Sequence, residues 1–257
     1  MVAAGDGVRS LPDGRPAPAE ALASRTAELA QRLAGRLETH AAGATIEAEG
    51  EPASSRVLVA GWAARVKMLS GGGRQILRLL VPGDFCSYAG AGRPSLSATV
   101  ALTRTKSVDL GAVTGAALRD PQTEALIATF APAPEVEHEA LLLHAVRLGR
   151  LSARERTLHL LLELWERLTR AGLADGRTML LPLTQEVLAD TLGLSVVHMN
   201  RTLQQLRREE LIEAQAGRFT LASPERLAAI CDYPLDATLD AGAQGRGRDG
   251  RATQTRA

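Results

Sequence analysis

The stretch that decides the fold is residues 183–221, LTQEVLADTLGLSVVHMNRTLQQLRREELIEAQAGRFTL. It predicts two short helices joined by a tight turn and followed by a two-stranded wing with its turn at Ala216 and Gly217. Thr184 is a candidate N-cap of the first helix and Ser195 of the second, while Gly193 can take the positive φ that ends a helix. This order of elements is that of a winged helix-turn-helix.

The second helix is predicted to run to about residue 210 and to have two different sides. Its apolar residues recur at spacings of four and three: Met199, Leu203 and Leu206. The opposite stripe is polar: His198, Arg201, Gln205 and Arg208. Three arginines and no acid lie between residues 195 and 208. Such a helix can lie in the major groove of DNA. The alternative is an ordinary helical hairpin whose charged face meets only solvent.

Residues 181–212, LPLTQEVLADTLGLSVVHMNRTLQQLRREELI, resemble the winged helix-turn-helix of Crp/Fnr-family bacterial transcription regulators. The resemblance implies an α+β fold with an N-terminal β-roll, which is a jelly-roll-like sensor domain similar to cyclic-nucleotide-binding domains. A long dimerisation helix and the DNA-binding domain follow it. It also implies a homodimer that binds a near-palindromic duplex and acts with RNA polymerase.

The resemblance also assigns roles to residues. Arg201 aligns with an arginine that reads bases throughout the family, and the neighbouring reading positions are Val197, His198 and Asn200. Val197 stands where the best-known members have glutamate, so it can contact a thymine methyl group but cannot accept a hydrogen bond from cytosine. The candidates for contact with the DNA backbone are Thr184, Gln185, Ser195 and Arg208. For the two hydroxyl residues, helix capping is the alternative role.

Composition restricts the class of protein. The 257 residues allow one large domain or two moderate ones, and 45% hydrophobic content with only 3% aromatic residues predicts cores of Leu, Val, Ile and Ala. The net charge of +1 requires any DNA affinity to come from a locally ordered face. Two distant cysteines, Cys86 and Cys231, fit a reducing compartment. With no signal peptide and no membrane span in the sequence, we expect a soluble cytoplasmic protein.

Residues 44–110 change to short, alternating segments separated by glycine-containing turns, which predicts a β-sandwich or roll. The strand candidates are residues 46–48, 57–59, 64–69, 75–80, 97–102 and 106–110. Residues 57–85, VLVAGWAARVKMLSGGGRQILRLLVPGDF, resemble the β-roll sensor of the same family more loosely.

Helices are predicted elsewhere, over residues 21–39, 112–118, 121–130, 135–148, 153–173 and 224–230. The helix over 135–148 is apolar around much of its circumference, so it needs a second surface to cover it. In the family this is the dimerisation helix; the alternative is a core helix of a single chain. Gly149 and Arg150 form a candidate hinge.

These patterns divide the chain into successive regions. The predicted division is a disordered leader (1–20), the β-roll (21–131), the dimerisation helix (132–150), the winged helix-turn-helix (151–235) and a disordered tail (236–257).

The sequence argues against several ligands. Cyclic-nucleotide-binding members have Gly-Glu after the P-G-D-F turn and a later Arg-Ala pair, but here Cys86-Ser87-Tyr88 and Ser97-Ala98 occupy these places. An unpaired cyclic phosphate would be costly to bury, which argues against cAMP. Two cysteines do not support an iron–sulfur cluster.

Metal binding and catalysis have no motif either. His138 and His144 are six residues apart, which is not the spacing of a helical metal pair, so a structural role is expected. A lone Cys86 is expected to be a small buried hydrophobe, with redox sensing left open. No catalytic constellation is present, so an enzyme is not expected. The rival hypothesis is a small-ligand or cyclic-nucleotide sensor whose helical half contacts protein instead of DNA.

Overall fold

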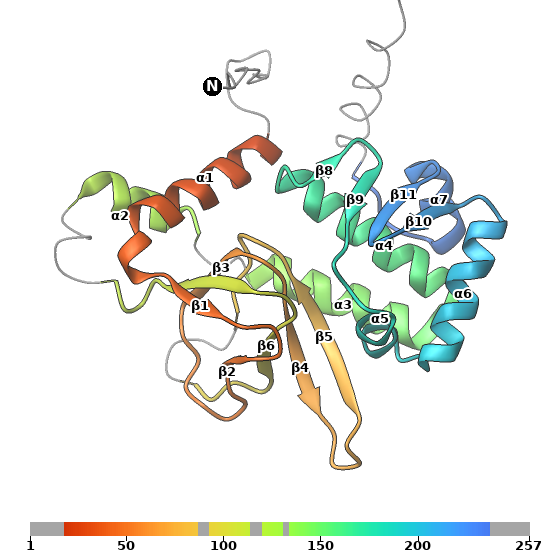
Figure 1. Ribbon diagram of the computed structural model, residues 1–257, viewed down its shortest axis with the longest axis horizontal. Coiled ribbons are helices and arrows are strands. Elements are labelled where there is room, and N and C mark those ends of the chain that lie inside the picture. Colours follow the sequence, from red (N-terminus) through yellow and green to blue (C-terminus); the bar gives the residue numbers. More distant parts are fainter. Residues whose placement is uncertain (1–17, 87–92, 114–119, 131–133, 237–257) are drawn as a thin grey trace, which may run out of the picture.

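The structure is a computed structural model that describes residues 18–86, 93–113, 120–130 and 134–236. A β-rich half and a helical half lie side by side, with α3 (Pro134–Arg150) running behind β4 and β5 (Figure 1). The β-rich half contains two antiparallel sheets, in the strand orders β1-β7-β3 and β2-β6-β4-β5. Its strands are β1 (Glu38–His40), β2 (Thr45–Glu47), β3 (Arg56–Ala60), β4 (Ala63–Met68), β5 (Arg74–Leu80), β6 (Ala98–Ala101) and β7 (Thr105–Asp109). The predicted β-roll is therefore present.

Helices cover one end of the β-rich half. They are α1 (Pro18–Arg32), the short 3-10 helix η1 (Ala34–Arg36) and α2 (Pro121–Ala128). Leu29 and Leu33 form a small core with Val57, Val108 and Phe130. This core fixes the N-terminal helix on the sheet β1-β7-β3.

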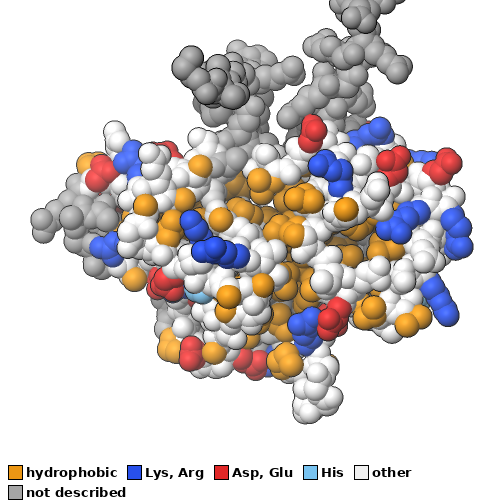
Figure 2. Space-filling view, viewed as in Figure 1, with side chains coloured by type: hydrophobic (Ala, Val, Ile, Leu, Met, Phe, Trp, Pro, Cys, Tyr) orange, Lys and Arg blue, Asp and Glu red, His pale blue; other side chains and the backbone are white. Residues whose placement is uncertain are grey.

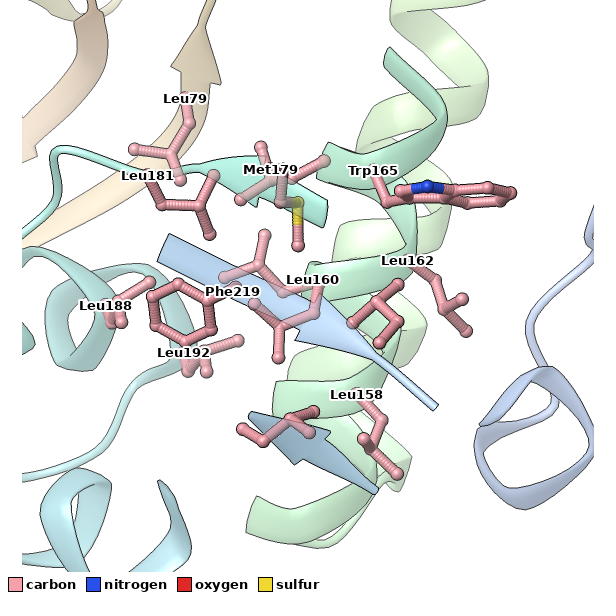
Figure 3. Close-up of a cluster of buried hydrophobic side chains, with 14 of the residues drawn as sticks. Leu79, Leu158, Leu160, Leu162, Trp165, Met179, Leu181, Leu188, Leu192 and Phe219 are labelled. Atoms are coloured by element: carbon pink, nitrogen blue, oxygen red, sulfur yellow. The ribbon is translucent and has the colours of Figure 1, made fainter. Parts of the chain in front are cut away.

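The helical half begins with α4 (Ala153–Arg170), which starts with a capping box between Ser152 and Glu155. After it come β8 (Ala174–Asp175), β9 (Thr178–Leu180), α5 (Gln185–Leu192), α6 (Val196–Arg208), β10 (Ile212–Gln215), β11 (Arg218–Leu221) and α7 (Pro224–Cys231). The strands form one antiparallel sheet in the order β10-β11-β9-β8. In Figure 3, Leu160 of α4 lies toward Phe219 of β11 and toward α5, whereas Trp165 and Leu162 point away from α5; all three α4 side chains are buried.

The largest apolar core takes side chains from both halves. Val66 of β4 and Ile76 and Leu79 of β5 belong to the same buried cluster as Leu188 and Leu192 of α5. Figure 3 shows Leu79 beside Leu181, the residue that leads from β9 toward α5. The helical half is thus packed against the β-roll rather than held by a linker alone.

Polar contacts follow the same boundary. The Gln75 side-chain amide donates to the Asp190 carbonyl (2.9 Å) and the Thr191 carbonyl (3.3 Å) at the end of α5. Arg74 forms an ion pair with the Asp190 carboxylate. Arg74 and Gln75 are the first two residues of β5. The start of this strand therefore contacts main-chain carbonyls and a side-chain carboxylate at the end of α5.

Ion pairs also tie α3 and α4 to the β-roll. Arg65 of β4 forms an ion pair with Glu137 of α3, and Arg78 of β5 lies 3.5 Å from the same carboxylate. Arg167 of α4 binds Asp84, the acid of the P-G-D-F turn. These side chains are mostly buried, so removing one partner would leave an uncompensated charge, which is costly.

Most predicted strands and helices are confirmed, with corrections at their ends. The helix predicted over 21–39 is wrong at its C-terminal end: α1 stops at Arg32, and Glu38–His40 instead form β1, which pairs with β7. The helix predicted over 153–173 ends at Arg170, because Gly172 adopts a left-handed φ of 66° and the unpredicted hairpin β8–β9 follows. Residues 112 and 113 are not helical, and the rest of the predicted helix 112–118 lies outside the described residues.

The hinge predicted at Gly149 and Arg150 is also shifted. Both residues are helical in α3, and the chain breaks instead at Leu151 and Ser152. The reason is local, since the Ser152 side chain caps α4 and its extended backbone, with ψ of 164°, cannot continue α3.

A buried arginine and two histidines join α3 to α4. Arg147 is 2% exposed, and its guanidinium donates to Nδ1 of His159 at 3.0 and 3.2 Å. It also lies 3.5 Å from Nδ1 of His144. A guanidinium only donates, so both rings must accept and are neutral. Burial, and next the Arg147 charge, lower the pKa of both histidines to about 4. Burial alone would raise the pKa of Glu163, but Arg147 and Arg167 lower it to about 2.

We expect the protein to lose stability when the pH falls from about 6.5 to 4, because histidine in the unfolded chain titrates near 6.5. Over that window the unfolded state binds more protons than the folded state, so each buried ring favours unfolding as the pH falls. The expected loss between pH 7 and pH 5 is about 1–3 kcal/mol in the free energy of unfolding, measured with urea.

The double variant His144→Asn, His159→Asn keeps an acceptor for Arg147 but cannot titrate, so its stability should change less over the same window. The matched control is His198→Asn, at an exposed histidine, which should behave as the wild type. An equal pH dependence in the double variant and the wild type would rule out these two rings as its source.

Candidate nucleic-acid interface

Two helix caps and one glycine build the helix-turn-helix, as the sequence predicts. The Thr184 hydroxyl accepts a hydrogen bond from the Val187 main-chain N–H at 3.2 Å. Gly193 ends α5 with φ 63°. The Ser195 hydroxyl then accepts from the His198 N–H at 3.2 Å and starts α6. Both hydroxyl residues therefore have the capping role that was the alternative to phosphate contact.

Packing fixes the rotation of α6 about its own axis. The predicted apolar stripe is confirmed: Met199 and Leu206 are fully buried and Leu203 is 2% exposed. Thr202, also buried, bonds back to the His198 carbonyl. Because one side of the helix is held in the core, the opposite side must face outward.

The predicted base-reading residues all lie on the exposed side of α6, namely Val197, His198, Asn200 and Arg201. In Figure 1 this helix forms one edge of the molecule, and Figure 2 shows Lys and Arg side chains along that edge. Arg208 of the backbone-contact set is exposed near the end of the same helix. Thr184, Gln185 and Ser195 are exposed at the N-terminal ends of α5 and α6.

The charges on α6 are arranged so that its arginines remain available. Among the described residues, no carboxylate lies within 4.0 Å of Arg201 or Arg208. Glu209, just after the helix, is bound instead by Gln205 and Arg154, each at 2.8 Å. These hydrogen bonds, from Gln205 first and then from Arg154, lower the pKa of Glu209, and the Arg208 charge adds to the effect.

Two further exposed polar residues lie on α6 and on the wing, although the sequence analysis did not select them. Gln204 lies one turn after Asn200, and its amide donates to the Asn200 side chain at 3.4 Å. Arg218 is exposed on the wing, directly after the Gly217 turn. The spacing of four residues from Asn200 and the basic residue at the wing turn are the signals that could have found them.

Arg156 of α4 contacts both the helix-turn-helix and the link between α3 and α4. Its Nε donates to the Leu151 carbonyl, in the link between α3 and α4, at 2.8 Å. Its Nη1 donates to the Leu192 carbonyl, at the turn before α6, at 3.2 Å. Arg156 therefore joins the chain segment after α3 to the end of α5, just before the turn into α6.

The candidate redox and metal-binding residues, Cys86, His138 and His144, lie in different environments. Cys86 is fully buried, and burial raises the pKa of its thiol to about 12, so it is protonated and poorly reactive. His144 is buried beside Arg147, whereas His138 is exposed. Within the described ranges, no three His, Cys, Asp or Glu side chains are grouped to hold a metal ion. No helix in those ranges is long and apolar enough to cross a bilayer.

Comparison with known proteins agrees with this geometry. Residues 155–230 match the family model of the Crp-like helix-turn-helix domain. The chain is 32% identical to the nitrogen fixation regulation protein FixK of Bradyrhizobium diazoefficiens, over 64% of this chain and 68% of that protein. It is also 32% identical to the transcriptional activatory protein AadR of Rhodopseudomonas palustris, over 67% of this chain and 71% of that protein.

Solved structures share the fold. The structure of FixK2 from Bradyrhizobium japonicum has a TM-score of 0.60 and 28% identity, covering 75% of this chain and 95% of that chain. A CRP-family transcriptional regulator from Thermus thermophilus has a TM-score of 0.55 at 22% identity, covering 78% of this chain and 99% of that one.

A β-roll, a connecting helix and a winged helix-turn-helix with an exposed basic face define a DNA-binding transcription regulator. The relatives are transcription regulators, which decides against the rival hypothesis of a helical half that contacts only protein. The chain belongs to the Crp/Fnr family of transcription regulators.

Proposed function

We propose that this regulator binds a near-palindromic DNA site as a homodimer. The two copies of α6 enter successive major grooves about 34 Å apart. The observation that carries this proposal is the exposed face of α6, on which Arg201 and Arg208 have no carboxylate within 4.0 Å among the described residues, while Glu209 is bound by Gln205 and Arg154.

The proposed roles divide the contacts into reading and positioning. Arg201 can bind guanine O6 and N7 through two hydrogen bonds, and His198 and Asn200 can donate to or accept from neighbouring base edges. Contacts to phosphates fix the register but carry no sequence information. The proposed base readers are Val197, His198, Asn200 and Arg201, and the proposed backbone contacts are Thr184, Gln185, Ser195 and Arg208.

The homodimer is supported by the unusual burial of α3. Its polar residues His144 and Arg147 are buried within the chain, whereas Leu141, Leu142 and Val146 are 46%, 53% and 50% exposed. Apolar side chains one turn apart on the outside of a helix favour pairing with a second copy about a two-fold axis. This pairing would set the two reading helices at a fixed separation.

We further propose the domain limits given by the sequence: a leader (1–20), the β-roll (21–131), the dimerisation helix (132–150), the DNA-binding domain (151–235) and a tail (236–257). The proposed protein acts by binding DNA and does not catalyse a reaction. Its proposed location is the cytoplasm, and its proposed protein partner is RNA polymerase. Support for this part comes from the relatives, which are transcription regulators.

The proposal is tested by selecting bound duplexes from a random DNA pool with the full-length chain and then titrating the selected site in a gel-shift series. We expect enrichment of one half-site repeated with inverted symmetry. Duplexes that enrich no common half-site, or a protein that ignores duplex DNA at low salt, would overturn the proposal.

Binding should weaken strongly with salt because arginines displace counterions from phosphates. If roughly four to seven phosphates are neutralised per dimer, the affinity should fall about 10²- to 10⁴-fold between 50 and 200 mM salt. Arg208→Gln should flatten the slope of log affinity against log salt by about 2 per dimer without changing the preferred sequence. An unchanged slope in Arg208→Gln would remove this residue from the phosphate contacts.

A further inference from the structure

Val197 is an apolar side chain placed where a polar one would be expected. It is 62% exposed, more than any other large hydrophobic residue among the described part of the helical half. It lies in the first turn of α6, and β-branched residues are not favoured in helices for their own sake. Its side chain is therefore available for contact with a partner outside the chain.

Helix geometry places Val197 at the centre of the outward face of α6. Successive residues turn by about 100°, so Val197 points about 180° away from Leu206, which is fully buried. Arg201 follows one turn later, about 40° around the helix from Val197. Val196 lies about 100° to the side and is less exposed, at 46%.

The chemistry around Val197 leaves it one kind of base edge to contact. The Ser195 hydroxyl is engaged in capping the helix, and the Val197 side chain has no group that could accept a hydrogen bond from cytosine or donate one to guanine. In the major groove the only methyl group belongs to thymine. We propose that Val197 selects thymine by contact with its C5-methyl group. This inference rests on the proposed role of α6 as the reading helix.

The helix also fixes where this thymine lies. Val197 and Arg201 are separated by about 6 Å along the helix axis, and base pairs are about 3.4 Å apart. The thymine should therefore lie within about two base-pair steps of the guanine bound by Arg201. The two copies in a dimer read the same thymine in each half-site.

The expected size follows from burying one methyl group. Its loss should weaken binding about 4-fold per half-site, and about 15-fold when both half-sites are changed. Deoxyuridine is the matched probe, because it differs from thymidine only by that methyl group and keeps the same hydrogen-bonding edge.

The test uses the full-length chain and the duplex selected from the random pool. Each thymine near the guanine is replaced by deoxyuridine in both half-sites, and affinity is measured by fluorescence anisotropy. One symmetric thymine pair should show the 15-fold loss with the wild type. With Val197→Ala the same replacement should cost less than about 3-fold. Val196→Ala is the matched control and should retain the full loss.

Two results overturn this inference while leaving the proposed function intact. One is an operator that binds equally well with deoxyuridine at every tested position. The other is a methyl effect that disappears in Val196→Ala but persists in Val197→Ala. A protein that enriches no duplex from the pool overturns both the inference and the proposed function.

Discussion

Replacing Arg201 with alanine should abolish the distinction between the selected operator and a scrambled duplex. A two-pronged guanidinium contact to guanine contributes about 1–3 kcal/mol of discrimination, and a dimer makes it twice. The expected loss in the affinity ratio is therefore roughly 30- to 10⁴-fold. Binding to the scrambled duplex should change little because Arg207 and Arg208 remain. Anisotropy titrations of both duplexes at one salt concentration measure the ratio.

The matched control is Arg226→Ala, which removes an exposed arginine from α7 instead of α6. It should leave the affinity ratio at the wild-type value. Since Arg201 is exposed, its removal should not change the thermal unfolding midpoint, which separates a binding defect from a folding defect. If Arg201→Ala binds the operator as tightly as the wild type, α6 is not the reading helix.

The double variant Leu142→Glu, Val146→Glu should be monomeric and should lose specific DNA binding. The two positions are about half exposed in the single chain, so carboxylates there are tolerated by the fold. In a pair of α3 helices they would bring four like charges to an apolar interface, which is strongly unfavourable. Without its second half-site the protein should bind the operator at least about 10³-fold more weakly.

Light scattering coupled to size-exclusion chromatography measures the mass, and anisotropy measures the affinity. Leu96→Glu is the control, because this leucine is 83% exposed in the β-rich half and its replacement introduces one carboxylate per chain away from α3. It should remain dimeric and bind normally. A wild-type protein that is monomeric at micromolar concentration, or a double variant that stays dimeric, would remove α3 from the dimer interface.

Local signals made the helix-turn-helix predictable. Thr184 and Ser195 accept hydrogen bonds from N–H groups three residues ahead, and Gly193 takes a left-handed conformation that favours glycine. The apolar spacing of α6 also depends only on neighbours within the helix. Each of these features depends on residues close together in the sequence. The residues exposed on α6 could therefore be predicted without coordinates.

Features that depend on distant parts of the chain were not predictable in the same way. Residues 38 and 39 were included in the predicted helix, but β1 pairs with β7, a strand far along the chain. His40 of β1 also bonds to Ser107, 67 residues away. The contact of Gln75 with Asp190 likewise joins segments 115 residues apart. The residue pattern within a single segment does not predict which distant segment it will contact.

The core shared by β4, β5 and α5 links the energies of the two halves. Separating them would expose Ile76 and Leu192 together, so neither half can lose its structure without cost to the other. Unfolding should then be one cooperative event rather than two. Any molecule that binds only the folded β-roll, or only the folded reading half, stabilises the whole chain by mass action. Binding at one end therefore raises the free energy of unfolding of the other end as well.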